Sequence, residues 1–319
     1  MHQLPSLAAC AFVLAATQLQ AQELPADIRI IVPLAAGSSL DARARIIADA
    51  LGKRLNRRVI VENRAGAGGT LASAVAARAK PDGSMLVFNN NSHVISPHIY
   101  AQAGYDPVKD FVPVAQAYLS GLVLVVHPDF GVNSLKDLVV KARRAPDPPS
   151  YASSGTGGVP HLAMELLLSK AGVKMLHIPY KGDGQALTDV LAGRVPVLMS
   201  GYQVVLPHIR AGKLRAVAVT SRVRVSILPD VPTIAQSGYP DYALDAWAGF
   251  FAPAGTSAAV VAKLNREIST ALATPALQEL LTSTGAQAVI SSPEEFAAFV
   301  MQEWIAYGKL VRELKLKAQ

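Results

Sequence analysis

The sequence predicts an α/β fold of two lobes, each with a mostly parallel sheet flanked by helices, and a ligand held between the lobes. Two stretches, residues 28–55 and 150–172, each run strand, small-residue loop, helix. Two apolar stretches, residues 111–127 and 242–253, are interpreted as strands that cross from one lobe to the other and back. Two crossings make the first lobe discontinuous. The expected boundaries are 22–122 with 247–319 for the first lobe and 123–246 for the second.

The first unit begins with a β-branched run at residues 28–32, typical of a buried parallel strand. Pro33 ends this strand because proline has no N–H to donate. The loop Leu34–Ser39 follows, and Ser38 with Asp41 fits a capping box, so a helix should begin near Ser38 or Ser39. Such a loop offers backbone N–H groups beside a helix N-terminus, which favours a bound anion. The alternative is that Ser38 and Asp41 only cap the helix.

The second unit repeats this arrangement. A strand begins at Ser150, the loop Ser154–Gly158 is rich in serine and glycine, and a helix extends toward Gly172. Two loops of this kind on two α/β units indicate that a negatively charged ligand lies between them.

The remaining elements follow in order along the chain. Gly66–Gly69 resembles a dinucleotide-binding fingerprint but fails it, because Leu71 stands where the third glycine belongs. A strand-to-helix turn is the expected role of these glycines. Further strands are predicted at residues 58–62, 85–88, 176–179, 195–199 and 214–220, and further helices at 70–78, 134–144, 185–191, 257–273 and from 292 onward.

Polar residues follow the strand at 85–88, in the run Asn89–His93. The end of a strand is where α/β sheets place ligand contacts, so this run is a candidate part of the site. The alternative is an ordinary turn rich in asparagine. The run Tyr180–Gly184 is a third candidate loop before a helix.

Composition indicates a globular protein with room for two domains. Hydrophobic residues make up 51% of the 319 residues and charged residues 17%, with a net charge of +7 and a pI near 9.5. A basic balance suits acidic small molecules and could equally suit nucleic acid. The Lys and Arg residues are scattered and lack aromatic interleaving, so we expect no nucleic-acid partner.

The N-terminal 21 residues resemble an export signal. Leu7–Ala16 is apolar, too short to span a bilayer, and a cut is expected after Ala21. His2 is the only cation before this run, so the true start is expected to lie upstream. The only cysteine, Cys10, lies inside the signal and also matches the pattern of a lipid-modified cysteine, although its lead-in is short. We therefore expect a periplasmic protein whose mature form has no thiol.

The sequence lacks the motifs of several enzyme classes. Ser153 and Ser154 lack the preceding glycine of a nucleophile elbow, neither Gly52-Lys53 nor Gly212-Lys213 continues as a P-loop, and no two histidines have ligand spacing. We expect no catalysis, no cofactor and no metal. The alternative from another class is a secreted serine hydrolase that uses Ser154 and His161 with an aspartate.

Many stretches resemble the solute receptors of the tripartite tricarboxylate transporters, the Bug-type periplasmic binding proteins. They run in order over nearly the whole mature chain: IRIIVPLAAGSSLDARAR, VIVENRAGAGGTLASAVAARAKPDG, YDPVKDFVPV, LVVHP, SYASSGTGG, PHLAMELL, HIPYKGDGQALTDVLAGRV, LPHIRAGKLRAVAVTS, LPDVPTIAQSGYP, APAGTS and SPEEF. The resemblance implies a two-lobed type II periplasmic binding fold, a small carboxylate in the cleft and membrane transporter subunits as partners. We expect a monomer. A receptor that feeds a sensor kinase is the alternative within the binding class.

The resemblance also implies, by position, a set of ligand-binding residues. The first lobe would supply its first loop, Asp41 as a buttress and the asparagine-rich run, and the second lobe its own loop and the rim. The expected residues are Leu34, Ala35, Ala36, Gly37, Ser38, Ser39, Asp41, Asn90, Ser92, His93, Ser154, Gly155, Thr156, Gly157, Gly158, Lys181, Gly182, Asp183, Ser200 and Tyr202.

The chain departs from the family pattern within this set. Leu34 replaces an aromatic residue, and Ser200 replaces an acidic one. The missing acid at position 200 argues against an amino-acid ligand, whose ammonium group would need a carboxylate partner. Asp183 is unusual beside an anion site; its role stays open, and binding of a ligand hydroxyl is one interpretation.

Overall fold

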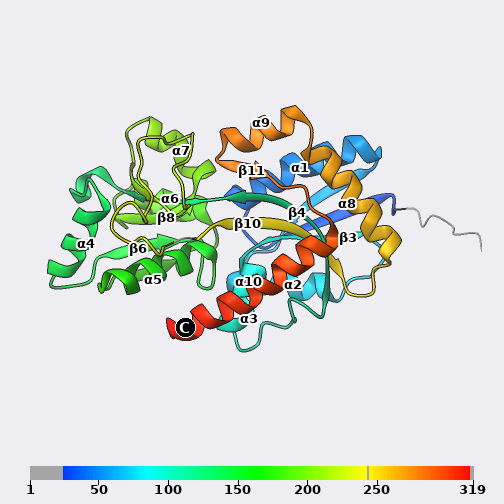
Figure 1. The fold of residues 1–319 in the computed structure, drawn as a ribbon, viewed down its shortest axis with the longest axis horizontal. Coiled ribbons are helices and arrows are strands. Elements are labelled where there is room, and N and C mark those ends of the chain that lie inside the picture. Colours follow the sequence, from blue (N-terminus) through cyan, green and yellow to red (C-terminus); the bar gives the residue numbers. More distant parts are fainter. Residues whose placement is uncertain (1–23, 243, 317–319) are drawn as a thin grey trace, which may run out of the picture.

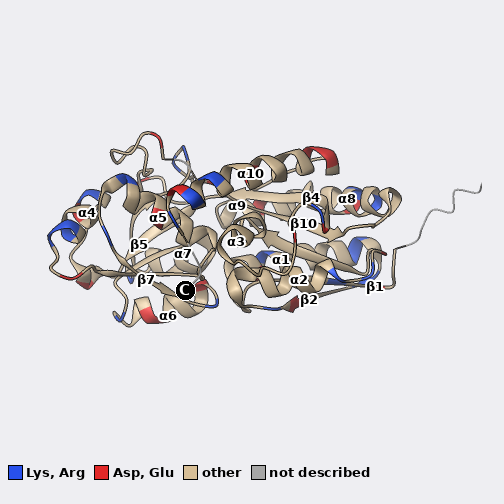
Figure 2. Ribbon diagram, turned by 90° about the horizontal axis from the view of Figure 1, so that it is seen from below, with Lys and Arg blue, Asp and Glu red and all other residues tan. Residues whose placement is uncertain are grey.

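The computed structural model describes residues 24–242 and 244–316, so the expected signal at residues 1–21 and Cys10 lie outside the described part. Figure 1 shows two lobes side by side, joined by extended segments that run between them. No helix in residues 24–242 and 244–316 is both long and apolar enough to cross a membrane. Lys and Arg residues occur along the ribbon of both lobes in Figure 2.

The first lobe contains a six-stranded sheet in the order β11-β4-β10-β3-β1-β2. Its strands are β1 Asp27–Val32, β2 Arg58–Asn63, β3 Met85–Asn90, β4 Phe111–Ser120, β10 Ala246–Pro253 and β11 Ala286–Ala288. Its helices are α1 Ser39–Leu55, η1 Ala67–Gly69, α2 Thr70–Ala77, α3 Ser92–Ile99, α8 Ala258–Leu272, α9 Pro275–Ser283 and α10 Pro293–Glu313.

Strand β1 shows how this lobe builds its two layers. Ile28, Ile30 and Val32 belong to the apolar cluster that contains α1 and α8. Ile31 belongs to the cluster that contains α2, α3 and α10. Successive side chains of a strand point to opposite faces. The sheet is therefore covered by helices on both sides, and the apolar residues of β1 are buried, whereas Asp27 and Arg29 are exposed.

The second lobe contains a five-stranded sheet in the order β7-β6-β8-β5-β9. Its strands are β5 Leu122–Val126, β6 Ser150–Ser153, β7 Leu176–Pro179, β8 Val197–Gly201 and β9 Arg215–Val219. Its helices are η2 Pro128–Phe130, α4 Leu135–Arg144, α5 Val159–Ala171, α6 Asp183–Leu191 and α7 Tyr202–Arg210.

Both sheets are mixed, where the sequence predicted mostly parallel ones. In the first sheet β1 is parallel to β2 and β3, whereas β10 is antiparallel to β3 and β4. In the second sheet β6 is parallel to β7 and β8, whereas β5 is antiparallel to β8 and β9. In the first sheet, the antiparallel pairs arise from the strands through which the chain passes between the lobes. The chain leaves the first lobe along β4 and returns along β10, so these neighbours run in opposite directions.

The predicted helix caps agree with the structure where a serine precedes an acidic residue. Ser134 caps α4, and Ser292 with Glu295 forms a complete capping box at α10. Helices α3 and α7 were not predicted, because each is short and contains a proline, Pro97 or Pro207. Helix α9 and strand β11 were also not predicted.

The chain changes sheet at Gly121, between β4 and β5, and returns before Ala246. The two crossings lie side by side, because Ala246 pairs with Ser120. A Cβ on Gly121 would lie 2.4 Å from the hydroxyl oxygen of Tyr202, so any larger residue at this crossing requires the buried Tyr202 to move. The expected lobe boundaries at 122/123 and 246/247 stay a prediction, and Leu122 already pairs in the second sheet and Ala246 in the first.

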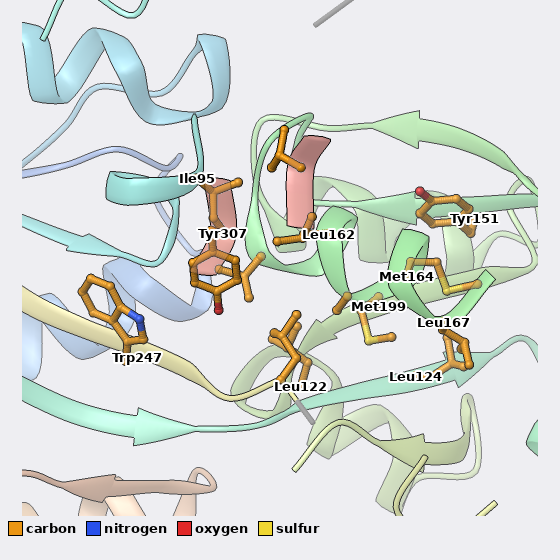
Figure 3. Close-up of a cluster of buried hydrophobic side chains, with 14 of the residues drawn as sticks. Ile95, Leu122, Leu124, Tyr151, Leu162, Met164, Leu167, Met199, Trp247 and Tyr307 are labelled. Carbon is orange, nitrogen blue, oxygen red and sulfur yellow. The ribbon is translucent and has the colours of Figure 1, made fainter. Parts of the chain in front are cut away.

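The two lobes are in contact. The amide of Ala35 donates to the carbonyl of Lys181 at 3.2 Å, and the Tyr100 hydroxyl donates to the carbonyl of Thr156 at 3.0 Å. One apolar cluster also extends through both lobes, and Figure 3 shows Ile95 and Tyr307 of the first lobe with Leu162 of the second.

Gly68→Ala is expected to hold the lobes apart. Gly68 has φ +61°, and a Cβ there would lie 2.6 Å from the carbonyl oxygen of Thr156 in the other lobe. Small-angle scattering should give a larger radius of gyration for the variant. The control is Gly212→Ala, which has a similar φ of +69° and open space around its Cβ. Equal radii for Gly68→Ala and the parent protein would show that this contact does not set the distance between the lobes.

Candidate functional site

Two adjacent cavities lie between the lobes and share Leu34 and Ser154 in their walls. The inner cavity has a volume of about 40 Å³, and the outer one about 520 Å³. A water molecule needs at least ~10–15 Å³, so the inner cavity has room for a few water-sized groups. Its walls consist of Leu34, Ser39, Leu40, Arg43, Asn90, Tyr118, Ser120, Gly121, Leu122, Ser154, Val159, Pro160, Asp183, Gly201, Ala246 and Trp247.

The first loop is fixed by side chains on both sides. Ser38 is the N-cap of α1, and its hydroxyl accepts the amide N–H of Asp41 at 3.3 Å. The Asp41 carboxylate accepts the amide N–H of Gly37 at 2.9 Å, rather than that of Ser38 as a capping box would require. Asn63 donates both to the Leu34 carbonyl and to Asp41. The loop therefore has one well-defined conformation.

The Asp41 carboxylate is ionised in this setting. Burial raises its pKa, but hydrogen bonds from Arg45, Gly37 and Asn63 outweigh this effect and keep the pKa below its usual value. A negative charge at the first turn of α1 also interacts favourably with the helix dipole.

The second loop leads from β6 into α5 through two glycines with positive φ, Gly155 and Gly157. The amide N–H of Gly158, the N-cap of α5, donates to the carbonyl of Gly155, and that of Gly157 donates to Nδ1 of His161 at 3.3 Å. The first-turn residues Val159 and Pro160 reach the inner cavity, as Ser39 and Leu40 of α1 do from the other lobe. Two helix N-termini thus face one cavity.

A pair of stacked histidines supports the second loop. The rings of His161 and His177 lie 4.1 Å apart, and His177 Nε2 is 2.7 Å from the Ser153 hydroxyl. The alternative of a serine hydrolase would pair Ser154 with His161, whose Nδ1 instead accepts the Gly157 amide. No hydrogen bond joins Ser154 to His161 within the described part of the chain. The same residues include no group of three or more His, Cys, Asp or Glu placed to hold a metal ion.

Comparison with known proteins places the chain in a family. Residues 43–316 match the model described as "Tripartite tricarboxylate transporter family receptor". The chain belongs to this receptor family.

Three solved structures of similar proteins are informative. The periplasmic binding protein BugD is 34% identical, with a TM-score of 0.88 over 92% of this chain and 99% of that one. An R. palustris protein with adipate is 30% identical, with a TM-score of 0.88 over 91% and 98%. MatC from Rhodopseudomonas palustris with bound malate is 31% identical, with a TM-score of 0.85 over 89% and 98%. The predicted two-lobed type II periplasmic binding fold is confirmed.

Some of the residues expected at the receptor's site border the two cavities. These are Leu34, Ser39, Asn90, Ser154, Gly155, Thr156, Lys181 and Asp183. The others do not contribute to these walls: Ala35, Ala36, Gly37, Ser38, Asp41, Ser92, His93, Gly157, Gly158, Gly182, Ser200 and Tyr202. Several of this second group, such as Asp41 and Gly37, hold the loops in place.

Two expected contacts are corrected by the structure. His93 is fully buried on α3, its ring stacks on Phe251 at 4.0 Å, and its Nε2 lies 3.1 Å from the carbonyl of Pro107. Tyr202 is fully buried beneath the crossing at Gly121. His93 packs inside the first lobe, whereas Tyr202 of α7 is buried against Gly121 and against Gly285 of the first lobe. The sequence did not predict the helices that carry these side chains, α3 and α7.

An acidic group does lie next to position 200 in the structure. Asp183 lies at the start of α6, and its Oδ2 accepts from the hydroxyls of Ser39 and Ser200 at 2.9 and 3.2 Å. A carboxylate is therefore present beside Ser200, supplied by another element. The missing acid at position 200 no longer argues against a ligand with an ammonium group.

Sequence reasoning missed Arg43, Tyr118 and Trp247 in the cavity wall. Arg43 was detectable, because it lies between Leu40 and Ile47 on the apolar face of α1, where a cation is unusual. Tyr118 and Trp247 lie on the crossing strands, and nothing in their spacing indicates which face they occupy.

The buried histidines predict that the protein loses stability in acid. Burial lowers the pKa of His177 to about 4 and that of His161 to about 3, from a usual value of 6.5. Below pH 6.5 the unfolded chain binds protons that the folded chain does not. Each histidine therefore removes up to about 1.4 kcal/mol of stability per pH unit as the pH falls toward 4.

Melting temperatures measured from pH 7 to pH 5 test this prediction. His177→Phe keeps a ring in the stack and cannot titrate, so its melting temperature should fall less than that of the parent protein. His208→Phe on α7 is the control and should follow the parent. Parallel curves for the parent and His177→Phe would contradict the assignment.

Proposed function

We propose that this protein is a periplasmic receptor that captures a small carboxylate between its lobes and delivers it to the membrane subunits of a tripartite tricarboxylate-type transporter. The observation that carries the proposal is the pair of helix N-termini at the inner cavity, Ser39 and Leu40 of α1 opposite Val159 of α5. The first N–H groups of a helix lack partners within it, and the dipole there is positive, so both ends favour an anion.

The family membership and the neighbouring structures support this proposal. The matching family model describes a transporter receptor, and two similar proteins are solved with the dicarboxylates adipate and malate. These proteins are solute-binding receptors rather than enzymes, so the bound compound should be released unaltered. A receptor that feeds a sensor kinase would use the same site, and the family model favours the transporter. Export through the signal at residues 1–21 is part of the proposal.

Ligand entry requires the lobes to separate. The inner cavity, at about 40 Å³, is far smaller than the ~300–1,000 Å³ of typical ligand sites. We infer a hinge at the two adjacent crossings, near Gly121 and Trp247, that opens and closes the cleft. Small-angle scattering with and without a saturating ligand should therefore differ in radius of gyration.

A thermal-shift screen with mono-, di- and aromatic carboxylates, followed by calorimetry, tests the function. A ligand that binds only the folded state stabilises it by about 2.7 kcal/mol at one hundred times its Kd. Ser154→Asp adds a negative charge in the wall shared by both cavities and should weaken carboxylate binding at least tenfold, about 1.4 kcal/mol. The control, Ser169→Asp, makes the same change at the exposed end of α5.

Two outcomes would contradict the receptor proposal. One is unchanged affinity in a folded Ser154→Asp variant, which would place the ligand elsewhere. The other is chemical turnover of the ligand or its esters, detected by mass spectrometry, that disappears in Ser154→Ala. The second outcome would favour the hydrolase.

A further inference from the structure

Arg43 is a buried cation in the wall of the inner cavity. It is 3% exposed, and one of its terminal nitrogens donates to the carbonyl of Thr284, at the end of α9, at 2.8 Å. Its guanidinium carbon lies 4.6 Å from the centre of the Tyr118 ring, a cation–π contact. Its Nε is buried and has no hydrogen-bond partner. Within residues 24–242 and 244–316, no carboxylate lies within 4.0 Å of its nitrogens.

Burying a charge without a counter-ion raises the free energy of the folded protein, so a bound anion beside Arg43 would stabilise it. Arg is also suited to this role, because its planar guanidinium binds a carboxylate through two parallel hydrogen bonds. The cation–π contact and the single bond to a carbonyl leave most of its five N–H donors available for such a ligand.

Asp183 is a buried anion in the wall of the same cavity. It is 4% exposed and projects from the second lobe, where its Oδ2 accepts from Ser39 and Ser200. A carboxylate has about four lone-pair sites, and these two hydroxyls use only part of them. Asp183 can therefore accept a further hydrogen bond from a ligand.

The charges of Arg43 and Asp183 both act on the Tyr118 hydroxyl. Tyr118 lies in the cavity wall, and burial raises the pKa of its hydroxyl. The Arg43 charge lowers this pKa, and the Asp183 charge raises it. The cavity thus has a cation on the first lobe and an anion on the second, with the apolar walls of Leu122, Val159 and Trp247 beside them.

We propose that Arg43 and Asp183 select a carboxylate that carries a hydrogen-bond donor, a hydroxyl or an ammonium group, over a plain dicarboxylate. The carboxylate binds Arg43, and the donor binds Asp183. This inference rests on the receptor function proposed above. A second carboxylate placed beside Asp183 would bring two negative charges together in a site with little water, which raises the free energy of the complex.

Two matched series test the selection by calorimetry at millimolar ligand. The four-carbon series is butyrate, succinate, 4-hydroxybutyrate and 4-aminobutyrate, and the six-carbon series is hexanoate, adipate, 6-hydroxyhexanoate and 6-aminohexanoate. In at least one series the hydroxy or amino member should bind at least tenfold tighter than the dicarboxylate. The comparison between these two members identifies which donor is preferred.

Variants locate the selection on the two residues. Asp183→Asn keeps an oxygen for the Ser39 and Ser200 hydroxyls and removes the charge, so the preference over the dicarboxylate should fall at least tenfold. Arg43→Lys keeps the positive charge but loses the planar guanidinium that forms two parallel hydrogen bonds, and Arg43→Gln loses both. Affinity for every carboxylate should therefore fall in Arg43→Lys and fall further in Arg43→Gln. The controls are Asp189→Asn, whose carboxylate binds Tyr180 and Arg194, and Arg54→Lys, which pairs with Glu267.

The outcomes separate this inference from the receptor function. A parent protein that binds succinate or adipate at least as tightly as the hydroxy and amino members refutes the selection and leaves the receptor intact. So does an unchanged preference in folded Asp183→Asn, or a failure of all hydroxy and amino members to bind. If no carboxylate of the wider screen binds, the receptor function fails as well.

Discussion

The arrangement depends on one constraint, that both connections between the lobes are neighbouring strands of one sheet. Because Ala246 pairs with Ser120, the outgoing and returning chains form one antiparallel ribbon. Gly121 lies in this ribbon, with Tyr202 packed so close that a Cβ would collide with its hydroxyl. Two paired strands of this kind allow one lobe to rotate relative to the other and oppose a translation of one lobe along the other. The inner cavity adjoins it, with Gly121, Ala246 and Trp247 in its wall. The proposed opening of the cleft is therefore a rotation about its base, where both crossings lie.

Polar groups of the two lobes meet across the cleft. Ser39 of α1 reaches Asp183 of α6, and Ala35 reaches the carbonyl of Lys181. Closure removes water from these polar groups, which is favourable only when each finds a partner. Asp183 has two hydroxyl partners, but Nε of Arg43 has none. In the closed arrangement the polar interface is thus incomplete at Arg43, and an anionic ligand would complete it.

The sequence predicted what local chemistry determines. Helix caps with a serine followed by an acidic residue gave correct starts for α1, α4 and α10, and a β-branched run located β1. The stretch 111–127, predicted as one crossing strand, is two strands, β4 and β5, in different sheets. It did not predict α3 and α7, whose internal prolines oppose helix formation and are tolerated because packing stabilises these short helices. That failure placed His93 and Tyr202 at the site, although both are core residues. Spacing places Arg43 on the apolar face of α1, but its contacts with Tyr118 of β4 and with Thr284 after α9 depend on tertiary packing that spacing does not encode.

The distribution of satisfied donors argues that side chains, more than loop backbone, set the ligand preference. The N–H groups of Ala35, Gly37 and Ser38 already donate to Lys181, Asp41 and Ala35. In the second loop, those of Gly155, Gly157 and Gly158 donate to Ser153, His161 and Gly155. A ligand thus meets the first turns of α1 and α5, whose N–H groups recognise a carboxylate and no more of the molecule. Groups that distinguish one acid from another must come from elsewhere in the wall. Arg43 and Asp183 are the charged side chains there, and they bear opposite charges on opposite lobes. A ligand that satisfies both must be negatively charged at one end and a hydrogen-bond donor at the other.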